Sequence, residues 1–384
     1  MIKALVFTLI LFTCKAFGAF DYTVSNTNFT LAQGSIFPNQ ERDYLYNYNR
    51  LRLRGDYTQE NYFFTLIGDG VNYLGHEYVN SASFKYVKLQ KSDTPFKTMS
   101  SFNDYYEGSV YAKLYRLYGG YEDDHHRIVL GVQNITMGVG RIWTPTNLFN
   151  PRNIYALEPD ETFGVAALSY TNHISTTGDL TFVISQKADY RFKYAARYKA
   201  FLDFSDLGIN LIHSDETTMA GYEVEANLAD TGIEVRSEGA YLQHTLKTGL
   251  NEKEEEAFFQ GIIGADYGFE NGITLIAELL YSSESFSYEE ILLNYDSEII
   301  PNLVYSKFYT AMSLAYSFNL FLDASFVYIE SFNDSNSRFV TPTLTYTFND
   351  YNTFSLGAMI QQGPKESEFG MFSDTYYFRY ALSF

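Results

Sequence analysis

Hydrophobic and polar residues alternate along most of this chain in blocks of about ten residues, and turn residues separate the blocks. Alternation with a period of two is typical of β-strands that have one apolar face and one polar face. The block at 354–360, for example, places Phe354, Leu356, Ala358 and Ile360 on the same side. Similar blocks lie at 222–228, 233–241, 339–348 and 376–384.

Aromatic residues make up 18% of the chain, with 35 Tyr and 33 Phe. Strands favour aromatic side chains, and tyrosine gathers at the two interfaces of a membrane. No apolar run after the first twenty residues reaches the roughly 18 residues that a membrane helix needs. A soluble sandwich also alternates, but it rarely places so many aromatics against a core only ~10 Å thick. The sequence therefore predicts an all-β fold, a transmembrane antiparallel β-barrel.

The joins between the blocks alternate between short turns and longer loops when they are counted back from Phe384. In outer-membrane barrels the short turns face the periplasm and the longer loops face outwards. The count gives about 18 strands with both ends periplasmic, and 16 or 20 stay open because 68–108 can hold another hairpin. Pro342 falls inside a strand, so it marks either the outer end of that strand or an error in the register. The expected strands are 20–30, 44–54, 59–68, 109–121, 126–135, 162–172, 178–186, 190–202, 206–213, 218–229, 232–242, 256–269, 272–283, 304–317, 319–331, 338–348, 352–362 and 374–384.

The first residues have the features of a secretory signal. Lys3 precedes an apolar run at 4–13, and Ala16 and Gly18 provide small residues before a cleavage site at Ala19. We therefore expect a signal peptide at 1–18 and a barrel domain at 19–384. A lipoprotein signal ending at Cys14 is the alternative, but the bulky residues before it fit that signal poorly. Cys14 is the only cysteine, so a mature chain would have no disulfide.

The formal net charge is −19, from 46 acidic and 27 basic residues. This balance argues against a nucleic-acid partner, because phosphate binding needs clustered Lys and Arg. The terminal strand ends in alternating aromatics at Phe384 and resembles the strand that the barrel-assembly machinery recognises. We expect the bacterial outer membrane as the location, with lipid and lipopolysaccharide as surroundings. Acidic loops at 252–256 and 284–303 either bridge divalent cations to lipopolysaccharide or are simply solvated.

Charged residues must point into the lumen of such a barrel, because hydrocarbon does not solvate them. Two rows of cations alternate with apolar residues, one at 50–54 and one at 190–200. Facing rows of opposite charge would set up a transverse field that orients polar solutes. The simpler alternative is that the charges only pair and solvate the lumen. The expected basic pore-lining residues are Arg50, Arg52, Arg54, Arg191, Lys193, Arg197, Lys199 and Arg379, and the acidic ones are Glu223, Glu225, Glu234 and Glu238.

The segment 131–153 holds the only Trp, two prolines and two arginines, and it opens a long outer loop. Its pattern resembles a signature of proteobacterial outer-membrane barrels of the alginate-export and porin-like type, with Asn147 where that pattern usually has Asp. The matching residues are Gly131, Gln133, Gly138, Gly140, Arg141, Trp143, Pro145, Thr146, Leu148, Phe149, Asn150 and Pro151. The resemblance implies an 18-strand-like barrel and passage of polar or anionic solutes.

This segment either folds inwards as a constriction or packs as a plug with Trp143 as its anchor. Glycines permit tight bends and prolines stiffen the path. The candidate constriction residues are Arg141, Trp143, Asn147, Asn150 and Arg152.

Enzymatic alternatives are weak. The spacing of His173 and Ser175 resembles an outer-membrane phospholipase, but the Asn-Gly that follows in that family is missing. The run 123–126 has the residue types of a barrel protease, yet adjacent strand residues face opposite ways. We expect no enzyme, no metal and no cofactor. The expected function is a porin-type channel for small polar or anionic solutes. The alternatives are an export conduit for an acidic polysaccharide and a blocked barrel that acts as an adhesin.

Overall fold

The computed structural model describes residues 18–38, 42–175, 177–249, 252–333 and 336–384. Most of the predicted signal segment, including Cys14, therefore lies outside the described residues. The strands are β1 (Ala19–Gly34), β2 (Asp43–Gln59), β3 (Tyr62–Leu74), β4 (Asn103–Tyr105), β5 (Gly108–Glu122), β6 (His126–Gln133), β7 (Val165–Ser175), β8 (Gly178–Gln186), β9 (Phe192–Phe201), β10 (Ser205–His213), β11 (Thr217–Asn227), β12 (Ile233–Lys247), β13 (Lys253–Gly268), β14 (Ile273–Ser282), β15 (Phe308–Ser317), β16 (Leu322–Ser331), β17 (Ser337–Asn349), β18 (Asn352–Gln362) and β19 (Thr375–Ser383).

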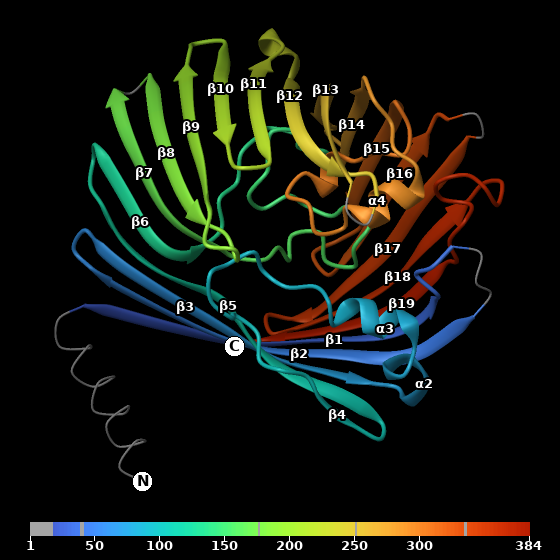
Figure 1. Ribbon diagram of the computed structural model, residues 1–384. Helices are drawn as coiled ribbons and strands as arrows, with labels where there is room; N and C mark the ends of the chain where they lie inside the picture. The colour runs from blue at the N-terminus through green and yellow to red at the C-terminus, as the bar shows by residue number, and fades with distance from the viewer. Residues whose placement is uncertain (1–17, 39–41, 176, 250–251, 334–335) are drawn as a thin grey trace.

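The strands form one closed antiparallel barrel (Figure 1). Each strand pairs with its neighbours along the chain, except that β3 pairs directly with β5 and the short β4 only extends the edge of β5. β1 pairs with both β2 and β19, which joins the two ends of the sheet. The short β4 forms a hairpin with β5 but is not one of the strands of the barrel wall. The prediction of an 18-strand barrel is therefore confirmed. Closure is what a membrane barrel requires, since it leaves no unpaired edge.

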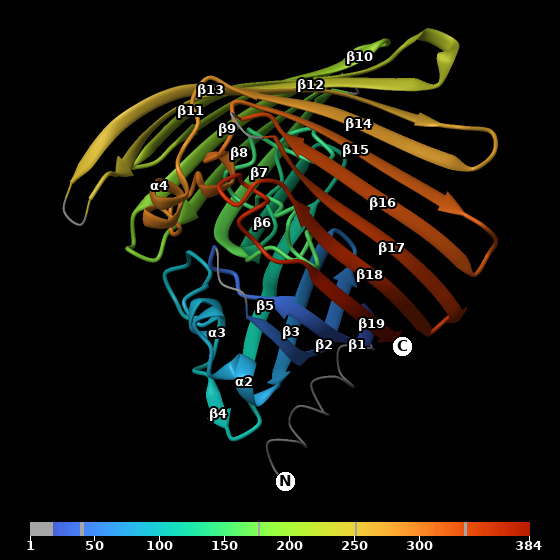
Figure 2. The same ribbon diagram turned by 90° about the vertical axis from the view of Figure 1, so that its right-hand side faces the viewer.

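Short turns lie at one end of the barrel and the longer segments at the other, as Figure 2 shows. The helices α2 (His76–Val79), α3 (Ala82–Val87) and α4 (Tyr288–Leu293) and the turn η2 (Ile300–Asn302) belong to the long-loop end, while the turn η1 (Ala229–Thr231) belongs to the other. The region left open at 68–108 contains α2, α3 and β4. None of the described helices is long and apolar enough to cross a membrane.

Pro342 lies inside β17 and not at its end. It is opposite Phe326 of β16, but the ladder to β18 pairs Val340 with Ile360 and then resumes at Thr343 with Gly357. The ladder lapses at the proline because the residue has no N–H to donate.

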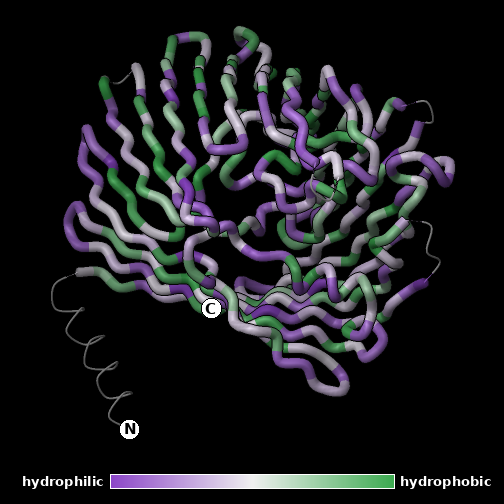
Figure 3. The backbone as a smooth tube through the Cα atoms, in the orientation of Figure 1, coloured by the Kyte–Doolittle hydropathy of each residue, from purple (hydrophilic) through white to green (hydrophobic). Residues whose placement is uncertain are grey.

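The outward faces of the strands are apolar and aromatic, and hydropathy alternates along the chain accordingly (Figure 3). The buried apolar residues lie on the inside, where the wall packs against segments that fold into the barrel. Ile135, Met137, Leu148 and Phe149 form one such contact with strands β7 to β13. Ile142 and Trp143 form a second with strands β13 to β18. Loops therefore occupy part of the lumen at the long-loop end and pack against the wall.

Phe29 stabilises the seam where the barrel closes. Its side chain is 1% exposed, and its ring lies 6.1 Å from that of Tyr48 and 5.8 Å from that of Tyr377, measured between centroids. We expect Phe29→Ala to cost about 3–5 kcal/mol of stability, because it leaves a cavity between β2 and β19. Thermal unfolding in detergent, read from the loss of the compact barrel on a gel, measures this. Tyr22→Ala is the control, since Tyr22 is 72% exposed on β1; an equal loss in both variants would contradict the prediction.

Candidate functional site: a lumen crossed by one segment

Residues 134–164 connect β6 to β7 and cross the barrel interior; we call them the crossing segment. Figure 1 shows this part of the chain, in green, inside the barrel. One part binds the wall of β11 to β14, and a later part binds β2. β2 and β12 lie half-way round the barrel from one another, so the segment is attached to opposite walls.

Three carboxylates on the wall hold the first part of the crossing segment. Glu238 accepts hydrogen bonds from the backbone N–H groups of Val139, Gly140 and Thr146 at 2.8, 3.0 and 2.7 Å, and from the Thr146 hydroxyl at 2.7 Å. Its side chain is buried. A buried carboxylate is tolerated when several donors surround it, and such charged hydrogen bonds are the strong ones.

Glu278 and Glu223 bind the residues on either side. Glu278 accepts from the backbone N–H groups of Arg141, Ile142 and Trp143 at 2.9, 3.2 and 2.8 Å. Glu223 accepts from the N–H of Gly138 at 2.8 Å, and it also binds the side chains of Asn210 and Arg197. Consecutive backbone N–H groups therefore converge on three wall carboxylates, as in other backbone anion sites.

The glycines of the motif have a steric reason to be there. Gly138 has φ +94°, where glycine is favoured, and a Cβ on it would lie 2.6 Å from a carboxylate oxygen of Glu238. A Cβ on Gly140 would lie 1.7 Å from the carbonyl oxygen of Trp143. The Gly-x-Gly-Arg-x-Trp pattern thus permits the tight path that brings the N–H groups to the carboxylates.

The predicted constriction residues lie in and around this segment with different contacts. The Asn150 side-chain oxygen accepts from the N–H of Ile135 at 2.6 Å, and the Asn147 amide donates to the carbonyl of Asn150 at 2.9 Å, so both brace the fold of the segment. Trp143 packs on Tyr309, with 5.9 Å between ring centroids. Arg152 binds the carbonyl of Arg141.

Arg141 reaches towards the short-turn end. It lies 2.7 Å from Glu234, 3.2 Å from Asp266 and 3.5 Å from Glu225, and its side chain is 43% exposed. Glu225 and Glu234 are thus ion-paired but partly accessible, whereas Glu223 and Glu238 are buried beneath the segment.

The other end of the crossing segment binds the arginine row of β2. Arg50 binds Glu158 at 2.9 Å through both of its terminal nitrogens, and Arg52 binds Glu161 at 2.8 Å. Arg52 also binds Asp69 of β3 at 2.7 Å. Arg54, the next lumen-facing residue on the strand, pairs with Asp56 and with no other carboxylate among the described residues, and 48% of its side chain is exposed. The row is therefore bound to the segment at one end and open to water at the other.

The second predicted cation row is largely engaged. Lys193 is buried, donates to the Leu148 carbonyl at 3.0 Å and lies 2.7 Å from Glu298. Arg197 binds Glu223, and Lys199 lies 3.1 Å from Asp206. Arg191 lies in the turn before β9, is exposed and binds Asp215. Arg379 lies over the ring of Phe29 on the seam strand. Only part of this row thus contributes free charge to the lumen.

Glu298 belongs to the loop 283–307, which also folds inwards. Burial opposes its charge, but the ammonium groups of Lys193 and Lys187 hold its pKa at about 2. The carboxylate is therefore ionised at neutral pH and ties this loop to the same wall that holds the crossing segment.

Several residues of the site were missed by the sequence reasoning. Lys113 and Arg116 of β5 both face the lumen beside the arginine row of β2, although residues three apart normally lie on opposite faces of a strand. A register shift opposite Ile67 and Gly68 explains this, because it adds a residue to β5. Glu278 was also missed, although an acid within the apolar strand 273–282 is a recognisable signal. The carboxylates that pair with Arg50 and Arg52 are Asp69, Glu158 and Glu161. They gave no recognisable sequence pattern, because β3 supplies the first and the crossing segment supplies the other two.

The two walls differ in charge. The wall of β2 and β5 carries five cations, and β3, β2 and the crossing segment supply four carboxylates near them: Arg50, Arg52, Arg54, Lys113 and Arg116, with Asp56, Asp69, Glu158 and Glu161. Strands β9 to β14 of the opposite wall carry at least seven inward carboxylates and four cations: Asp206, Glu223, Glu225, Glu234, Glu238, Asp266 and Glu278, with Lys193, Arg197, Lys199 and Arg236. Arg141 of the crossing segment lies against them. The balance leans positive on one side and negative on the other.

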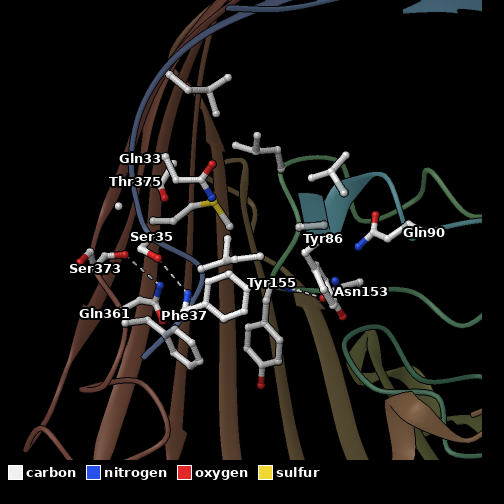
Figure 4. A pocket seen from close by; sticks show the side chains of 18 of the residues that line it. Gln33, Ser35, Phe37, Tyr86, Gln90, Asn153, Tyr155, Gln361, Ser373 and Thr375 are labelled. Carbon is white, nitrogen blue, oxygen red and sulfur yellow. Dashed lines mark hydrogen bonds between the residues drawn. The ribbon is translucent and has the colours of Figure 1, made fainter. Parts of the chain in front are cut away.

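A cavity of about 650 Å³ lies on the outer side of the crossing segment; we call it the vestibule. It is bordered by the inner face of β1, by α3, by the crossing segment and by the loop 363–374. Figure 4 shows that amides, hydroxyls and aromatic rings point into it, among them Gln33, Tyr86, Asn153 and Tyr155. Of the described residues that line it, none is Lys or Arg, and the charged ones are Glu158 and Glu368. A second cavity of about 470 Å³ adjoins it and shares Tyr155 and Glu368.

The residues considered for enzymatic alternatives serve turns at the other end. Asp123 accepts from the N–H groups of His125 and His126, and His173 bonds to Asp179 across a hairpin at 2.6 Å. No group of three His, Cys, Asp or Glu suited to a metal ion occurs among the residues that the structure describes.

Comparisons with known proteins agree with this architecture. No family model and no curated protein matches the chain. Solved structures do match: OccAB1 of Acinetobacter baumannii (TM-score 0.61, 11% identity, 95% of each chain covered) and OccD3 (OpdP) of Pseudomonas aeruginosa (TM-score 0.57, 11% identity, 95% of this chain and 91% of that one). OpdK of Pseudomonas aeruginosa, solved with vanillate, has a TM-score of 0.55 and 9% identity over 95% of this chain and 98% of its own.

We expect Glu238→Ala to loosen the crossing segment, because four donors lose their acceptor and each charged hydrogen bond contributes ~1.5–3 kcal/mol. Trypsin should then cut after Arg141 or Arg152 in the folded barrel, and single-channel current should rise and become noisier. Limited proteolysis followed by mass spectrometry, with bilayer recording, measures both. Glu255→Ala, on the exposed rim of β13, is the control. An intact segment in the Glu238 variant would show that the carboxylate does not hold it.

The pH dependence of the loop 363–374 follows from Glu368. Burial raises the pKa of Glu368 to about 7, and the nearby Ser331 and Tyr309 hydroxyls offset this only in part. A raised carboxyl pKa means that docking of the loop is most stable below the ordinary pKa and weakens as the pH rises through about 7. We expect hydrogen exchange in 363–374, corrected for the intrinsic rate, to increase between pH ~6 and ~8. Glu368→Gln should remove this dependence; an unchanged profile in the variant would assign it to another group.

The chain is an 18-strand barrel with the fold of the Occ channels, and it is crossed by a segment that is fixed to opposite walls.

Proposed function

We propose that this chain is an outer-membrane channel for the passive passage of small polar solutes, with the crossing segment as its constriction. The observation that carries the proposal is the attachment of residues 134–164 to both walls, which narrows the lumen without filling it. A vestibule of about 650 Å³ remains on the outer side, and Arg54 remains exposed on the inner part of the arginine row. Pockets of this volume suit one small molecule at a time.

The charge of the lumen supports selectivity as well as passage. One wall has a small excess of cations and the other an excess of carboxylates, and such an arrangement orients dipolar solutes and disfavours apolar ones. A solute from outside would first meet a largely aromatic surface whose described lining has no Lys or Arg, and the arginine row second. The Occ channels that share this fold include one solved with vanillate, a small aromatic carboxylate. An anionic group on the solute fits the arginine row.

The other candidates fit the geometry less well. An export conduit for an acidic polysaccharide needs a passage wide enough for a polymer chain, and the crossing segment narrows the lumen. Kinship with alginate-export barrels rests on the motif in 131–153 alone. A blocked adhesin would need the segment to seal the lumen. Contacts of the assembly machinery with the strand ending at Phe384 and of lipopolysaccharide with the acidic loops stay proposals.

Planar-bilayer recording tests the channel. We expect stable conductance with a preference for anions, and no conductance at all would overturn the proposal in favour of a blocked barrel. Competing small carboxylates added on the outer side should reduce the ion current while they occupy the constriction.

We expect Arg54→Gln to lower the ratio of anion to cation permeability roughly sevenfold, because removing one charge ~7 Å from the ion path raises the energy of an anion and lowers that of a cation by about 0.6 kcal/mol each. Arg54→Glu should shift the ratio further in the same direction. The reversal potential in a salt gradient measures the ratio. Lys253→Gln removes an equal charge at the outer rim, where the side chain is 50% exposed and pairs with Glu216, and should leave selectivity nearly unchanged. Equal effects at the two positions would mean that the arginine row does not face the ion path.

A further inference from the structure

One part of the barrel exterior is polar at a level where the rest is apolar. Five asparagines on the first three strands point outwards, and we call them the asparagine face: Asn26, Asn28, Asn47, Asn49 and Asn72. Their direction follows from the register, which pairs Asn28 with Asn49 and Asn26 with Leu51. Leu51 is 45% exposed, while the alternate residues Phe29 and Arg50 are buried inside.

The asparagine face lies within the lipid belt. Asn28 is paired with Tyr380 of β19, and Asn26 with Leu382, both on the outward aromatic face of that strand. Along β2 the asparagines lie between outward-facing leucines, with Leu51 on one side and Leu45, which is 74% exposed, on the other.

Amides in hydrocarbon carry a cost that these residues offset only in part. Asn28 and Asn47 exchange hydrogen bonds of 3.0 and 2.9 Å, and Asn26 and Asn49 exchange bonds of 3.2 and 3.3 Å. Asn26 also donates to the carbonyl of Arg50 and Asn47 to the hydroxyl of Thr30, both at 3.3 Å, and Asn72 accepts from the hydroxyl of Tyr105 at 2.8 Å. Each side-chain amide has two donor hydrogens and two acceptor lone pairs. These bonds leave one donor hydrogen on Asn28 and one on Asn49, and part of the acceptor capacity of the side-chain carbonyls, for which acyl chains offer no partner.

Small residues adjoin the asparagine face. Gly70 pairs with Leu51 and Gly68 with Leu53, so both glycines lie on the outward side of β3. A Cβ on Gly70 would meet nothing within 4 Å, and one on Gly68 would meet only a backbone oxygen at 4.0 Å. This leaves a shallow notch beside the amides. Small residues and hydrogen-bonding side chains are enriched where transmembrane helices contact one another, because they permit close approach and polar pairing, and the same physical argument applies to two barrel walls.

The opposite wall provides the contrast. In Figure 1, β1 to β3 lie at the bottom of the barrel and β10 at the top. The outward residues of β10 are Leu207, Ile209 and Leu211, which are all exposed. That surface is suited to lipid alone.

We propose that the asparagine face binds the same face of a second copy of this chain. Two copies inserted with the same orientation and related by a two-fold axis along the membrane normal bring residues of equal height together. A side-chain amide both donates and accepts, so equal heights give matching partners without any second kind of surface. The notch at the glycines lets the two walls approach closely.

Cross-linking between two tagged copies tests the pairing. In a Cys14→Ser background, Asn49→Cys chains with two different affinity tags are co-expressed, and outer membranes are treated with a short, membrane-permeant bifunctional maleimide. We expect a cross-linked species that carries both tags. Ile209→Cys, 61% exposed on β10, is the matched control and should give none above background. No doubly tagged species at position 49, or equal yields at both positions, would overturn the proposal.

A second measurement keeps the proposal independent of cysteine geometry. Native mass spectrometry of the unmodified barrel should show twice the mass of one chain. Asn28→Leu with Asn47→Leu should give single chains that still show the compact, heat-modifiable barrel, because the backbone ladder is unaffected. A dimer that persists in this variant, or a single chain in the parent, would exclude the asparagine face as the contact. Channel conductance is not used as a readout, so failure here is distinguishable from failure of the proposed function.

Discussion

Hydrocarbon offers no hydrogen-bond partner, and the rest of this structure depends on that constraint. Backbone N–H and C=O groups at the level of lipid must pair within the protein, so the sheet has to close, and β1 pairs with β19 to close it. Closure then separates two surfaces along every strand. Leucine and aromatic side chains face lipid, and the charges of β2 and β12 are placed inside, where they meet water or one another.

The same preference for paired polar groups organises the interior. A loop that enters the lumen brings unpaired N–H groups with it, and the wall provides carboxylates to accept them. Glu238 and Glu278 together accept six backbone N–H bonds from the crossing segment, and Glu158 and Glu161 fix its far end to arginines. Charges that would otherwise only line the lumen thereby become the attachment of the crossing segment. Arg54 keeps part of its charge exposed, and the proposed channel would use that charge on its solute.

Alternation and turn lengths were enough to predict the barrel and its strand number. Both signals are local, since alternation is visible within one strand and the length of a turn within one connection. Prediction of the site was less complete. The motif at 138–146 indicated an inward segment, but its contacts with Glu238 join residues almost a hundred positions apart. Alternation placed Glu223 and Lys193 on the inner face, yet it did not distinguish a charge facing water from one buried beneath a loop. Lys113 and Arg116 were missed because the phase of β5 changes at the register shift.

The outward side chains of the barrel are mostly apolar, and the asparagine face is an exception to this pattern. The exception indicates that lipid alone does not cover this part of the wall. Asn28 and Asn49 face outwards on one side of the barrel, whereas the outward residues of β10 include Leu207 and Ile209. If lipid covered both walls alike, amides would only add cost, since leucine fits the same strand geometry without unpaired groups. The cross-strand amide pairs reduce that cost without removing it. A surface that holds hydrogen-bonding capacity at lipid depth, beside glycines that create a notch, is one that gains stability when a matching protein surface covers it.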